Sequence, residues 1–321
     1  MALLAACGGG GTTSAAPQPP GAPGYPVGLT TQTIQSGGVT RQFRIHVPPA
    51  LQAPRAIVFV LHGGGGLGMG VADTGAHPLS VFRPVADREG FVVVYPGGLP
   101  APSGDVGWND CRSDNFNGSS ADDVRFLADL VDLIKSTYGL PSTRVFMAGG
   151  SNGGLMSFAF AFNHPQRIAA IAVSSANLPE NPKSGACTSG LQQPLPVLMT
   201  HGTLDPQMPY GGGCVADFGG ACLRGRVTSA QATRNWWLTL NGLASAQPTE
   251  TVIERSANDA GPANRFVYAG ARPVQWWRLD GAGHSAASRT VLIPTTVDNG
   301  AQNRDIEFAE VAWEFFASLL P

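Results

Sequence analysis

The serine best placed for covalent chemistry is Ser151, which lies within the sequence GGSNG at residues 149–153. The run RVFMA at 144–148 directly before it is typical of a buried strand, and the run LMSFAFAF at 155–162 is long enough for a helix. A corner of this kind holds the serine hydroxyl out over the end of a sheet, where it can attack an acyl carbonyl. The corner is crowded, so the residues two before and two after the serine must lack a side chain. The same motif also fits a helix that is capped by serine after a glycine turn, so its interpretation depends on other parts of the chain.

A serine nucleophile needs a base and an acid that orients the base, and both follow Ser151 in the sequence. Asp205 comes just after the apolar run at 196–200, and His284 lies in a glycine-rich loop after a later run. His284 would accept the proton of Ser151 and return it to a leaving alcohol, while Asp205 would hold the imidazole in the correct tautomer. Asp280 is a second candidate for the acid. All the other histidines precede Asp205, and we expect structural roles for them.

The order of serine, acid and histidine fits the α/β-hydrolase fold, in which two backbone N–H groups bind the developing oxyanion. One comes from the residue after the nucleophile, which is Asn152 here. The other comes from a loop after an early strand, and the sequence HGGGG at 62–66 follows the apolar run at 56–61. A phosphate-binding loop is the alternative, but the run lacks the Lys-Ser/Thr ending of a P-loop. We expect His62 and His201 to hydrogen-bond loops at the mouth of the site.

The elements that must position these residues alternate between strand and helix. Continuous apolar runs predict buried strands at 56–61, 91–95, 144–148, 168–173, 197–200 and 274–279, and a hairpin is expected over 31–47. Helical spacing or length predicts helices near 122–134, 155–162, 229–240 and 308–316. The alternation indicates an α/β protein with a doubly wound, mostly parallel sheet and helices on both faces. Because the chain ends just after the last helix, we expect no C-terminal polymer-binding module.

Composition favours one globular domain. The chain has 321 residues, of which 43% are hydrophobic and 13% are charged, with a formal net charge of −2. One α/β domain of this size can bury a large core, so we assign residues 27–321 to a single catalytic domain. The near-neutral charge argues against nucleic acid as a partner. The expected chemistry needs no cofactor, and we expect a monomer.

The first 26 residues differ in composition from the rest, because glycine and proline dominate them. This composition predicts a flexible linker. The sequence LAAC at 4–7 resembles the bacterial lipobox, in which the cysteine, here Cys7, becomes the lipidated first residue of the mature chain. We therefore expect an exported bacterial protein whose membrane contact is made only through this anchor. Six residues precede Cys7, fewer than a signal peptide needs, and the alternative is an ordinary N-terminus of small residues.

Four further cysteines, an even number, suggest two disulfides in an exported chain. Cys214 and Cys222 are eight residues apart in a glycine-rich loop, so we pair them, which leaves Cys111 with Cys187. Metal ligation is the competing interpretation. The chain has no C-x-x-C motif and no histidine near these cysteines, so we expect no metal site.

Taken together, these motifs resemble the secreted polyhydroxybutyrate depolymerase and feruloyl esterase family of α/β-hydrolases. The matching pieces are LHGG at 61–64, GWN at 107–109, DDVRF at 122–126, RVF at 144–146, GGSNGG at 149–154, and HGT at 201–203 with Asp205, Pro209 and Tyr210. The resemblance implies a carboxylic ester hydrolase that acts on hydroxyalkanoate polyesters or on feruloyl or acetyl esters of plant cell walls. It also implies that Gly64 supplies the second oxyanion N–H. The chain departs from the family at the histidine loop, where SAAS at 285–288 replaces Thr-Trp-Pro.

Trp108 is our candidate for an aromatic side chain that faces the substrate, since an indole can stack on a flat acyl group or support a polyester chain. The alternative is that Trp108 packs under its own loop beside Cys111. Two other functions also compete with ester hydrolysis: a serine peptidase that uses the same residues, and a non-catalytic surface binding protein that has kept the fold. The presence of Ser151, Asp205 and His284 together favours an enzyme that hydrolyses esters, with either a polymer or a small soluble ester as its substrate.

Overall fold

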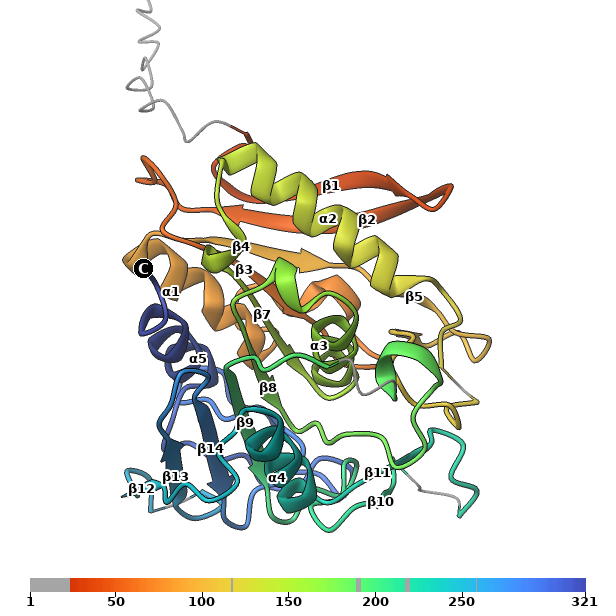
Figure 1. The fold of residues 1–321 in the computed structure, drawn as a ribbon, viewed down its shortest axis with the longest axis vertical. Helices are drawn as coiled ribbons and strands as arrows, with labels where there is room; N and C mark the ends of the chain where they lie inside the picture. Colours follow the sequence, from red (N-terminus) through yellow and green to blue (C-terminus); the bar gives the residue numbers. More distant parts are fainter. Residues whose placement is uncertain (1–23, 117, 189–191, 217–219, 258) are drawn as a thin grey trace, which may run out of the picture.

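The computed structural model describes residues 24–321 except 117, 189–191, 217–219 and 258, so Cys7 and most of the expected linker lie outside the described residues. In the described part, ten strands form one sheet in the order β1-β2-β4-β3-β7-β8-β9-β14-β13-β12 (Figure 1). They are β1 (Gly28–Ser36), β2 (Val39–Val47), β3 (Ile57–Leu61), β4 (Val92–Pro96), β7 (Val145–Gly150), β8 (Ala170–Ser174), β9 (Val197–Gly202), β12 (Thr249–Ile253), β13 (Ala263–Tyr268) and β14 (Val274–Leu279). The strands from β4 to β14 in this order run parallel, and the strands at both edges run antiparallel. The doubly wound, mostly parallel fold class is thereby confirmed.

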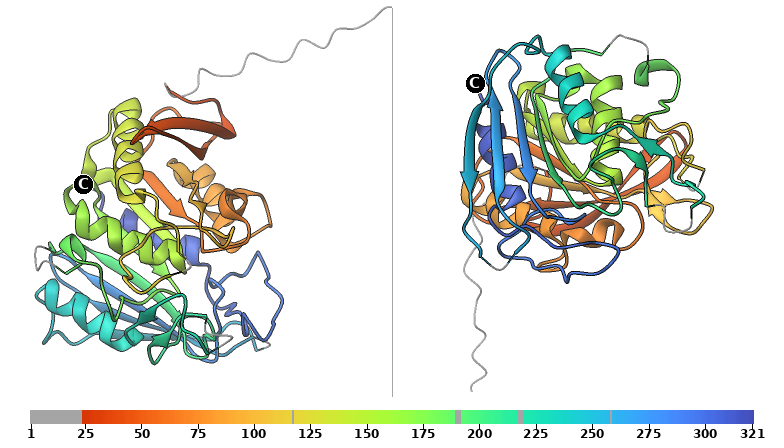
Figure 2. Two further views of the ribbon diagram at one scale, coloured as in Figure 1. Left: turned by 90° about the vertical axis from the view of Figure 1, so that its right-hand side faces the viewer. Right: turned by 90° about the horizontal axis from the view of Figure 1, so that it is seen from below.

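Helices cover both faces of the sheet (Figure 2). They are α1 (Phe82–Glu89), α2 (Asp123–Tyr138), α3 (Asn152–Asn163), α4 (Ala230–Leu240) and α5 (Phe308–Ala317). Alternate side chains of β3 pack on opposite sides: Phe59 joins the core under α2, α3 and α4, whereas Val58 joins the core under α1 and α5. A strand that is buried on both faces has no polar face to present, which explains why the central strands read as unbroken apolar runs.

The topology brings the candidate site residues to one edge of the sheet. The glycine run follows β3, Ser151 follows β7, Asp205 follows β9 and His284 follows β14. These strands lie close together in the order β3-β7-β8-β9-β14 and are parallel, so their carboxyl ends meet at the same edge. Open α/β sheets bind ligands in the crevice at this edge.

Most elements agree with the sequence, and the exceptions share a cause. Every predicted strand and helix is present, and Asp122 and Ser229 cap α2 and α4 by accepting backbone N–H groups. The sequence analysis did not predict α1, β12 and β13. Helix α1 is short and has Pro84 in its first turn, while β12 is an exposed edge strand that antiparallel pairing with β13 holds in place. These elements depend on their neighbours more than on an apolar run.

Smaller elements lie in the segments that connect these strands and helices. Two short ladders join β5 (Leu99–Pro100) to β6 (Val106–Gly107) and β10 (Gly213–Cys214) to β11 (Arg226–Val227). Short 3-10 helices are η1 (Gly68–Ala72), η2 (Pro78–Val81), η3 (Ser142–Arg144), η4 (Pro165–Arg167) and η5 (Gly185–Cys187). Among the described residues, no helix combines the length and the apolar character needed to cross a membrane.

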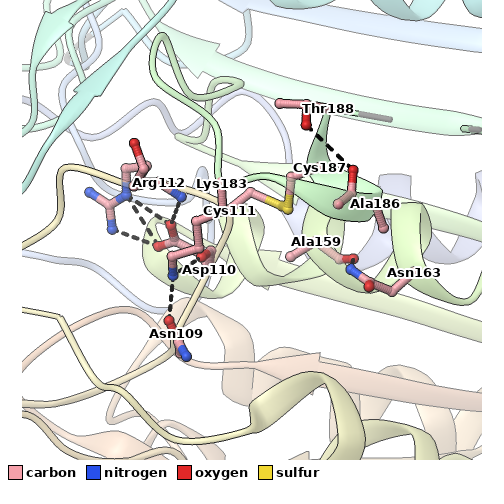
Figure 3. The surroundings of a disulfide bond; sticks show 12 residues. Asn109, Asp110, Cys111, Arg112, Ala159, Asn163, Lys183, Ala186, Cys187 and Thr188 are labelled. Carbon is pink, nitrogen blue, oxygen red and sulfur yellow. Dashed lines mark hydrogen bonds and ion pairs between the residues drawn. A yellow bond between two sulfur atoms is a disulfide. The ribbon is translucent and has the colours of Figure 1, made fainter. Parts of the chain in front are cut away.

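Both expected disulfides are present. Cys111–Cys187 links the loop after β6 to η5, with Cα atoms 5.8 Å apart (Figure 3). Cys214–Cys222 closes the hairpin loop between β10 and β11, with Cα atoms 5.1 Å apart. Disulfides persist in oxidising compartments, so the pair is typical of an exported protein.

The two bridges differ in the length of chain that they close, with separations of 76 and 8 residues. We expect Cys111→Ala with Cys187→Ala to lower the free energy of unfolding by roughly 4 kcal/mol, and Cys214→Ala with Cys222→Ala by about 2 kcal/mol, because a longer loop constrains the unfolded chain more. Urea unfolding of the two double variants measures this difference. A smaller loss for the longer loop would contradict the expectation.

Candidate active site

Ser151 occupies a strained backbone corner between β7 and α3. Its φ of 53° and ψ of −124° lie where residues with a side chain rarely stay, and its N–H donates to Ser174 O at 2.9 Å. A Cβ on Gly149 would run into the backbone of Gly153, and a Cβ on Gly153 would run into the carbonyl oxygens of Leu61 and His62. The expectation that both flanking positions must lack a side chain is confirmed. The corner therefore exists because backbone packs directly on backbone.

His284 and Asp205 meet Ser151 in one continuous hydrogen-bonded chain. His284 Nε2 lies 2.8 Å from Ser151 Oγ, and His284 Nδ1 lies 2.9 and 2.8 Å from the two carboxylate oxygens of Asp205. An ionised carboxylate can only accept, so Nδ1 carries the proton and Nε2 is left to accept from the serine hydroxyl. This tautomer suits a base that removes the proton of Ser151.

Asp205 is buried yet held as an anion. Its Oδ1 accepts the backbone N–H groups of Gln207 and Met208 at 2.9 and 2.8 Å. Burial by itself would raise the pKa of Asp205, but the charge and hydrogen bond of His284 outweigh burial, with help from His201 and the Met208 N–H, and the pKa is lowered. The carboxylate can therefore stabilise an imidazolium at neutral pH.

The loops that carry Asp205 and His284 touch through their backbones. A Cβ on Gly202 would run into the carbonyl oxygens of Ala282 and Gly283. His284 N donates to Asn299 O at 2.6 Å, so the segment after the histidine loop folds back and holds it. His201 Nε2 donates to Met208 O at 2.8 Å. This histidine therefore hydrogen-bonds a loop of the site, as expected, and that loop is the one that carries Asp205.

Asp280, the second candidate for the acid, does not contact His284 in the structure. Its carboxylate accepts hydrogen bonds from Arg278 at 2.7 and 3.1 Å and from Asn264 at 2.9 Å. The partners of Asp280 are thus side chains of the neighbouring strands β13 and β14. The structure favours Asp205 as the partner of His284.

Gly64 and Asn152, the candidate oxyanion donors, lie side by side. A Cβ on Gly64 would be 3.4 Å from Asn152 Cβ, so the glycine permits this approach. Asn152 is the first residue of α3, and a first-turn N–H has no acceptor within its own helix. Among the described residues, the Gly64 N–H donates to no acceptor. Both amides are therefore available to an oxygen placed above Ser151.

His62 determines which way the Gly64 N–H points. Its Nε2 accepts from Gly98 N at 3.0 Å, so its Nδ1 carries the proton and donates to Gly63 O at 2.7 Å. Because the peptide unit is planar, fixing the Gly63 carbonyl also fixes the Gly64 N–H on its opposite side. The expectation that His62 braces a loop at the mouth of the site is confirmed.

A buried polar network holds Asn152 from below. Its Oδ1 accepts the Trp108 N–H at 2.7 Å, and its Nδ2 donates to Asp110 Oδ2 at 2.7 Å. Asp110 in turn pairs with Arg112 at 2.6 Å, and Cys111 between them is tied to Cys187 (Figure 3). The loop after β6 is therefore clamped to the first turn of α3.

The structure corrects the expectation for Trp108. The indole has no exposed surface, its Nε1 donates to His62 O at 2.8 Å, and its ring packs on the His62 imidazole with centroids 4.7 Å apart. The Asn152 clamp turns the loop so that the side chain points inward. Trp108 is among the residues that line the first cleft beside Ser151, but its indole is covered. The structure therefore favours the alternative, in which Trp108 packs under its own loop.

Two clefts flank Ser151. The first cleft is lined by Gly64, Ala101, Asp105, Arg112, Asn152, Leu155, Met208, Val215 and Arg224 among others, and its volume is about 60 Å³. The second cleft is lined by Gly63, Val71, Ala76, His77, Ser175, His284, Ser285, Ala286, Ile293 and Asn299 among others, and its volume is about 310 Å³. An ion pair of 3.3 Å between Asp105 and Arg224 borders the first cleft. The sequence analysis missed this pair and His77, because neither belongs to a motif.

Three acidic residues that do not line either cleft form a cluster of their own. The carboxylate oxygens of Glu254, Asp259 and Asp305 lie within 4.8 Å of one another. Asp305 accepts the backbone N–H groups of Arg255 and Ser256, and Asp259 accepts those of Gly261 and Arg304. Asp259 and Asp305, the two less exposed members of the cluster, therefore have a structural role, because they hold neighbouring loops through these hydrogen bonds.

The glycine requirement of the corner can be tested with a neighbouring glycine as control. We expect Gly153→Ala to lower the free energy of unfolding by about 1–3 kcal/mol, because the new methyl group displaces the backbone of β3. Gly150→Ala is the control, since a Cβ there meets nothing within 4 Å. Urea unfolding of both variants measures the effect, and equal stability of the two would be inconsistent with a corner built on backbone contact.

His62 should make the fold sensitive to acid. Burial lowers the pKa of His62 from 6.5 to about 4, so the unfolded chain takes up a proton at a higher pH than the folded chain. Its contribution to stability is present above pH 6.5 and is lost as the pH falls toward 4, by at most about 3 kcal/mol. In His62→Gln, whose amide can accept from Gly98 N, this loss is absent. The difference in unfolding free energy between wild type and variant should shrink as the pH falls from 7 to 4.5, and a constant difference refutes the assignment.

Known proteins resemble this chain in sequence and in fold. A family model described as phospholipase/carboxylesterase matches residues 44–217. The chain is 29% identical over 187 residues to the putative esterase NocK of Nocardia uniformis subsp. tsuyamanensis, over 57% of this chain and 50% of the relative. It is 24% identical over 246 residues to a probable feruloyl esterase C of Aspergillus niger, over 74% of this chain and 83% of the relative.

Among solved structures, the acetyl xylan esterase from Aspergillus awamori superposes with a TM-score of 0.59 at 19% identity, over 90% of this chain and 99% of that chain. This likeness shows the fold alone. The chain spans half or less of the length of the first curated relatives that it matches. The family model covers more than half of the chain, and on that match the protein belongs to the phospholipase/carboxylesterase family of α/β-hydrolases.

Proposed function

We propose that the protein is a serine carboxylic ester hydrolase that works through an acyl-enzyme. The observation that carries the proposal is the unbroken hydrogen-bonded chain from Ser151 through His284 to Asp205. The relatives named as esterases and the carboxylesterase family model support the same reaction class.

In this mechanism Ser151 Oγ attacks the ester carbonyl while His284 Nε2 takes its proton. The carbonyl oxygen becomes an oxyanion between the N–H groups of Gly64 and Asn152, each worth about 3 kcal/mol of transition-state stabilisation. His284 then gives the proton to the leaving alcohol, and Asp205 stabilises the imidazolium in between. A water molecule enters on the same side, loses a proton to His284 and releases the acid.

The position of His284 assigns a role to each cleft. The leaving alcohol must lie within hydrogen-bond reach of His284 Nε2. His284 lines the second cleft and is absent from the lining of the first, so the alcohol part occupies the second cleft and the acyl part the first. The first cleft has the smaller volume, which favours short acyl groups on larger alcohols. Of the ester classes expected from the sequence, acetyl esters of polysaccharides fit this division best.

Export of the protein is consistent with its two disulfides. Lipidation of Cys7, an envelope location and a monomeric state stay predictions from the sequence, and Cys7 lies outside the described residues.

The reaction class is tested by removing the nucleophile. We expect Ser151→Ala to lower kcat for p-nitrophenyl acetate by a factor of about 10⁴ or more, and Asp205→Asn by about 10⁴, with folding retained. Ser113→Ala, a surface serine that donates to Asn181 O, is the control and should keep wild-type turnover. Turnover unchanged in Ser151→Ala would exclude the proposal.

Two further measurements separate the competing functions. A fluorophosphonate probe labels only an activated serine, so labelling that requires Ser151 excludes a non-catalytic binding protein. Turnover of peptide amides in place of esters would favour a peptidase. A panel of acetylated xylan, methyl ferulate and hydroxybutyrate oligomers tests the acyl preference, and faster turnover of the ferulate ester would contradict the assignment of the small cleft to the acyl group.

A further inference from the structure

His77 borders the second cleft although no motif marks it. It lies between η1 and η2 and shares the cleft wall with His284 and Ser285, which follow β14. The side chain is half-buried. Two segments distant in sequence thus place a second imidazole beside the space that the leaving alcohol would fill.

A backbone contact fixes the tautomer of His77. As the N-cap of η2, its Nδ1 accepts the backbone N–H of Leu79 at 3.1 Å. A neutral imidazole whose Nδ1 accepts must carry its proton on Nε2. Among the described residues, Nε2 of His77 makes no hydrogen bond, and it is not among the buried side-chain atoms that lack a partner. The ring therefore keeps an unused and accessible N–H donor.

His77 is neutral at neutral pH. Burial lowers its pKa to about 4, and nearby His284 and His62 act in the same direction. A neutral ring with Nδ1 occupied cannot serve as a second base through that atom. What remains is a polarised donor in a mixed wall, in which Val71, Ala286 and Ile293 are apolar. The same wall carries other polar side chains, among them Ser175, Gln207 and Asn299.

We propose that His77 is a specificity-determining residue: its Nε2–H donates to an oxygen in the alcohol part of the ester, a few bonds beyond the ester oxygen. This inference rests on the proposed function. This hydrogen bond would favour esters whose alcohol part carries an ether, hydroxyl or carbonyl oxygen near the ester, such as sugars or hydroxyacid chains. Esters of alkyl alcohols of the same size would be disfavoured. Without that oxygen, the Nε2–H would lose water on binding and gain no partner, which penalises the alkyl ester.

Two acetate esters of matched size isolate this contact. In 2-methoxyethyl acetate an ether oxygen replaces one methylene group of n-butyl acetate, while the acyl group and chain length are unchanged. We expect the wild type to favour the methoxyethyl ester in kcat/KM. The variant His77→Ser keeps an oxygen that can cap Leu79 N but has no Nε2–H. We expect the ratio of the two kcat/KM values to fall about three- to tenfold in His77→Ser, the range of one neutral hydrogen bond.

Controls separate a contact with substrate from a structural role. His77→Asn, whose side chain also caps the helix but is shorter, repeats the measurement, and the thermal midpoint and the rate of fluorophosphonate labelling of Ser151 report on the fold and on the nucleophile. An unchanged ratio in a folded variant, or an equal loss for both esters, overturns the assignment of His77. If the wild type hydrolyses neither ester, the proposed function itself is wrong. The two failures are therefore distinguishable.

Discussion

The site depends on one constraint, which is the contact of backbone with backbone around Ser151. The positive φ of Ser151 places its hydroxyl beyond the sheet edge, and that conformation persists only because the surrounding chain leaves no other arrangement. Gly149 and Gly153 allow the end of β7, the start of α3 and the end of β3 to touch. Gly202 makes a similar contact between the loops of the acid and of the histidine. The side chains of Ser151, Asp205 and His284 meet because the loops that carry them make these close backbone contacts at glycines.

Around this corner, each polar group of the site is held by one or more hydrogen-bond partners. Asp205 is held by two backbone N–H groups and by His284, Asn152 by Trp108 and Asp110, and the Gly63 carbonyl by His62. Burying a polar group costs free energy unless the group is hydrogen-bonded, so these contacts hold each group in one orientation. Most of these contacts act on the orientation of an N–H or of a ring nitrogen, which are the groups that ester hydrolysis would use.

The disulfides lie at the same edge and serve the same loops. Cys111 lies between Asp110 and Arg112 (Figure 3), and Asp110 accepts the hydrogen bond from Asn152 Nδ2. Cys214 and Cys222 close the hairpin that bears Val215 and Arg224, two residues of the first cleft. Loops at the carboxyl edge of a sheet have little core beneath them, and covalent links limit their motion where binding needs a defined shape.

The sequence by itself determined the fold class, the central strands and the candidate nucleophile, acid and base. Each depends on a local signal: an unbroken apolar run, a glycine beside a serine, or the position of a polar residue just after a strand. The disulfide pairing also followed from sequence spacing. The tertiary structure alone decided the inward direction of Trp108, the pairing of Asp280 with Arg278 and the place of His77 on the cleft wall. These features depend on which segments meet across long separations, and side-chain direction in a loop is set by partners that no local pattern specifies.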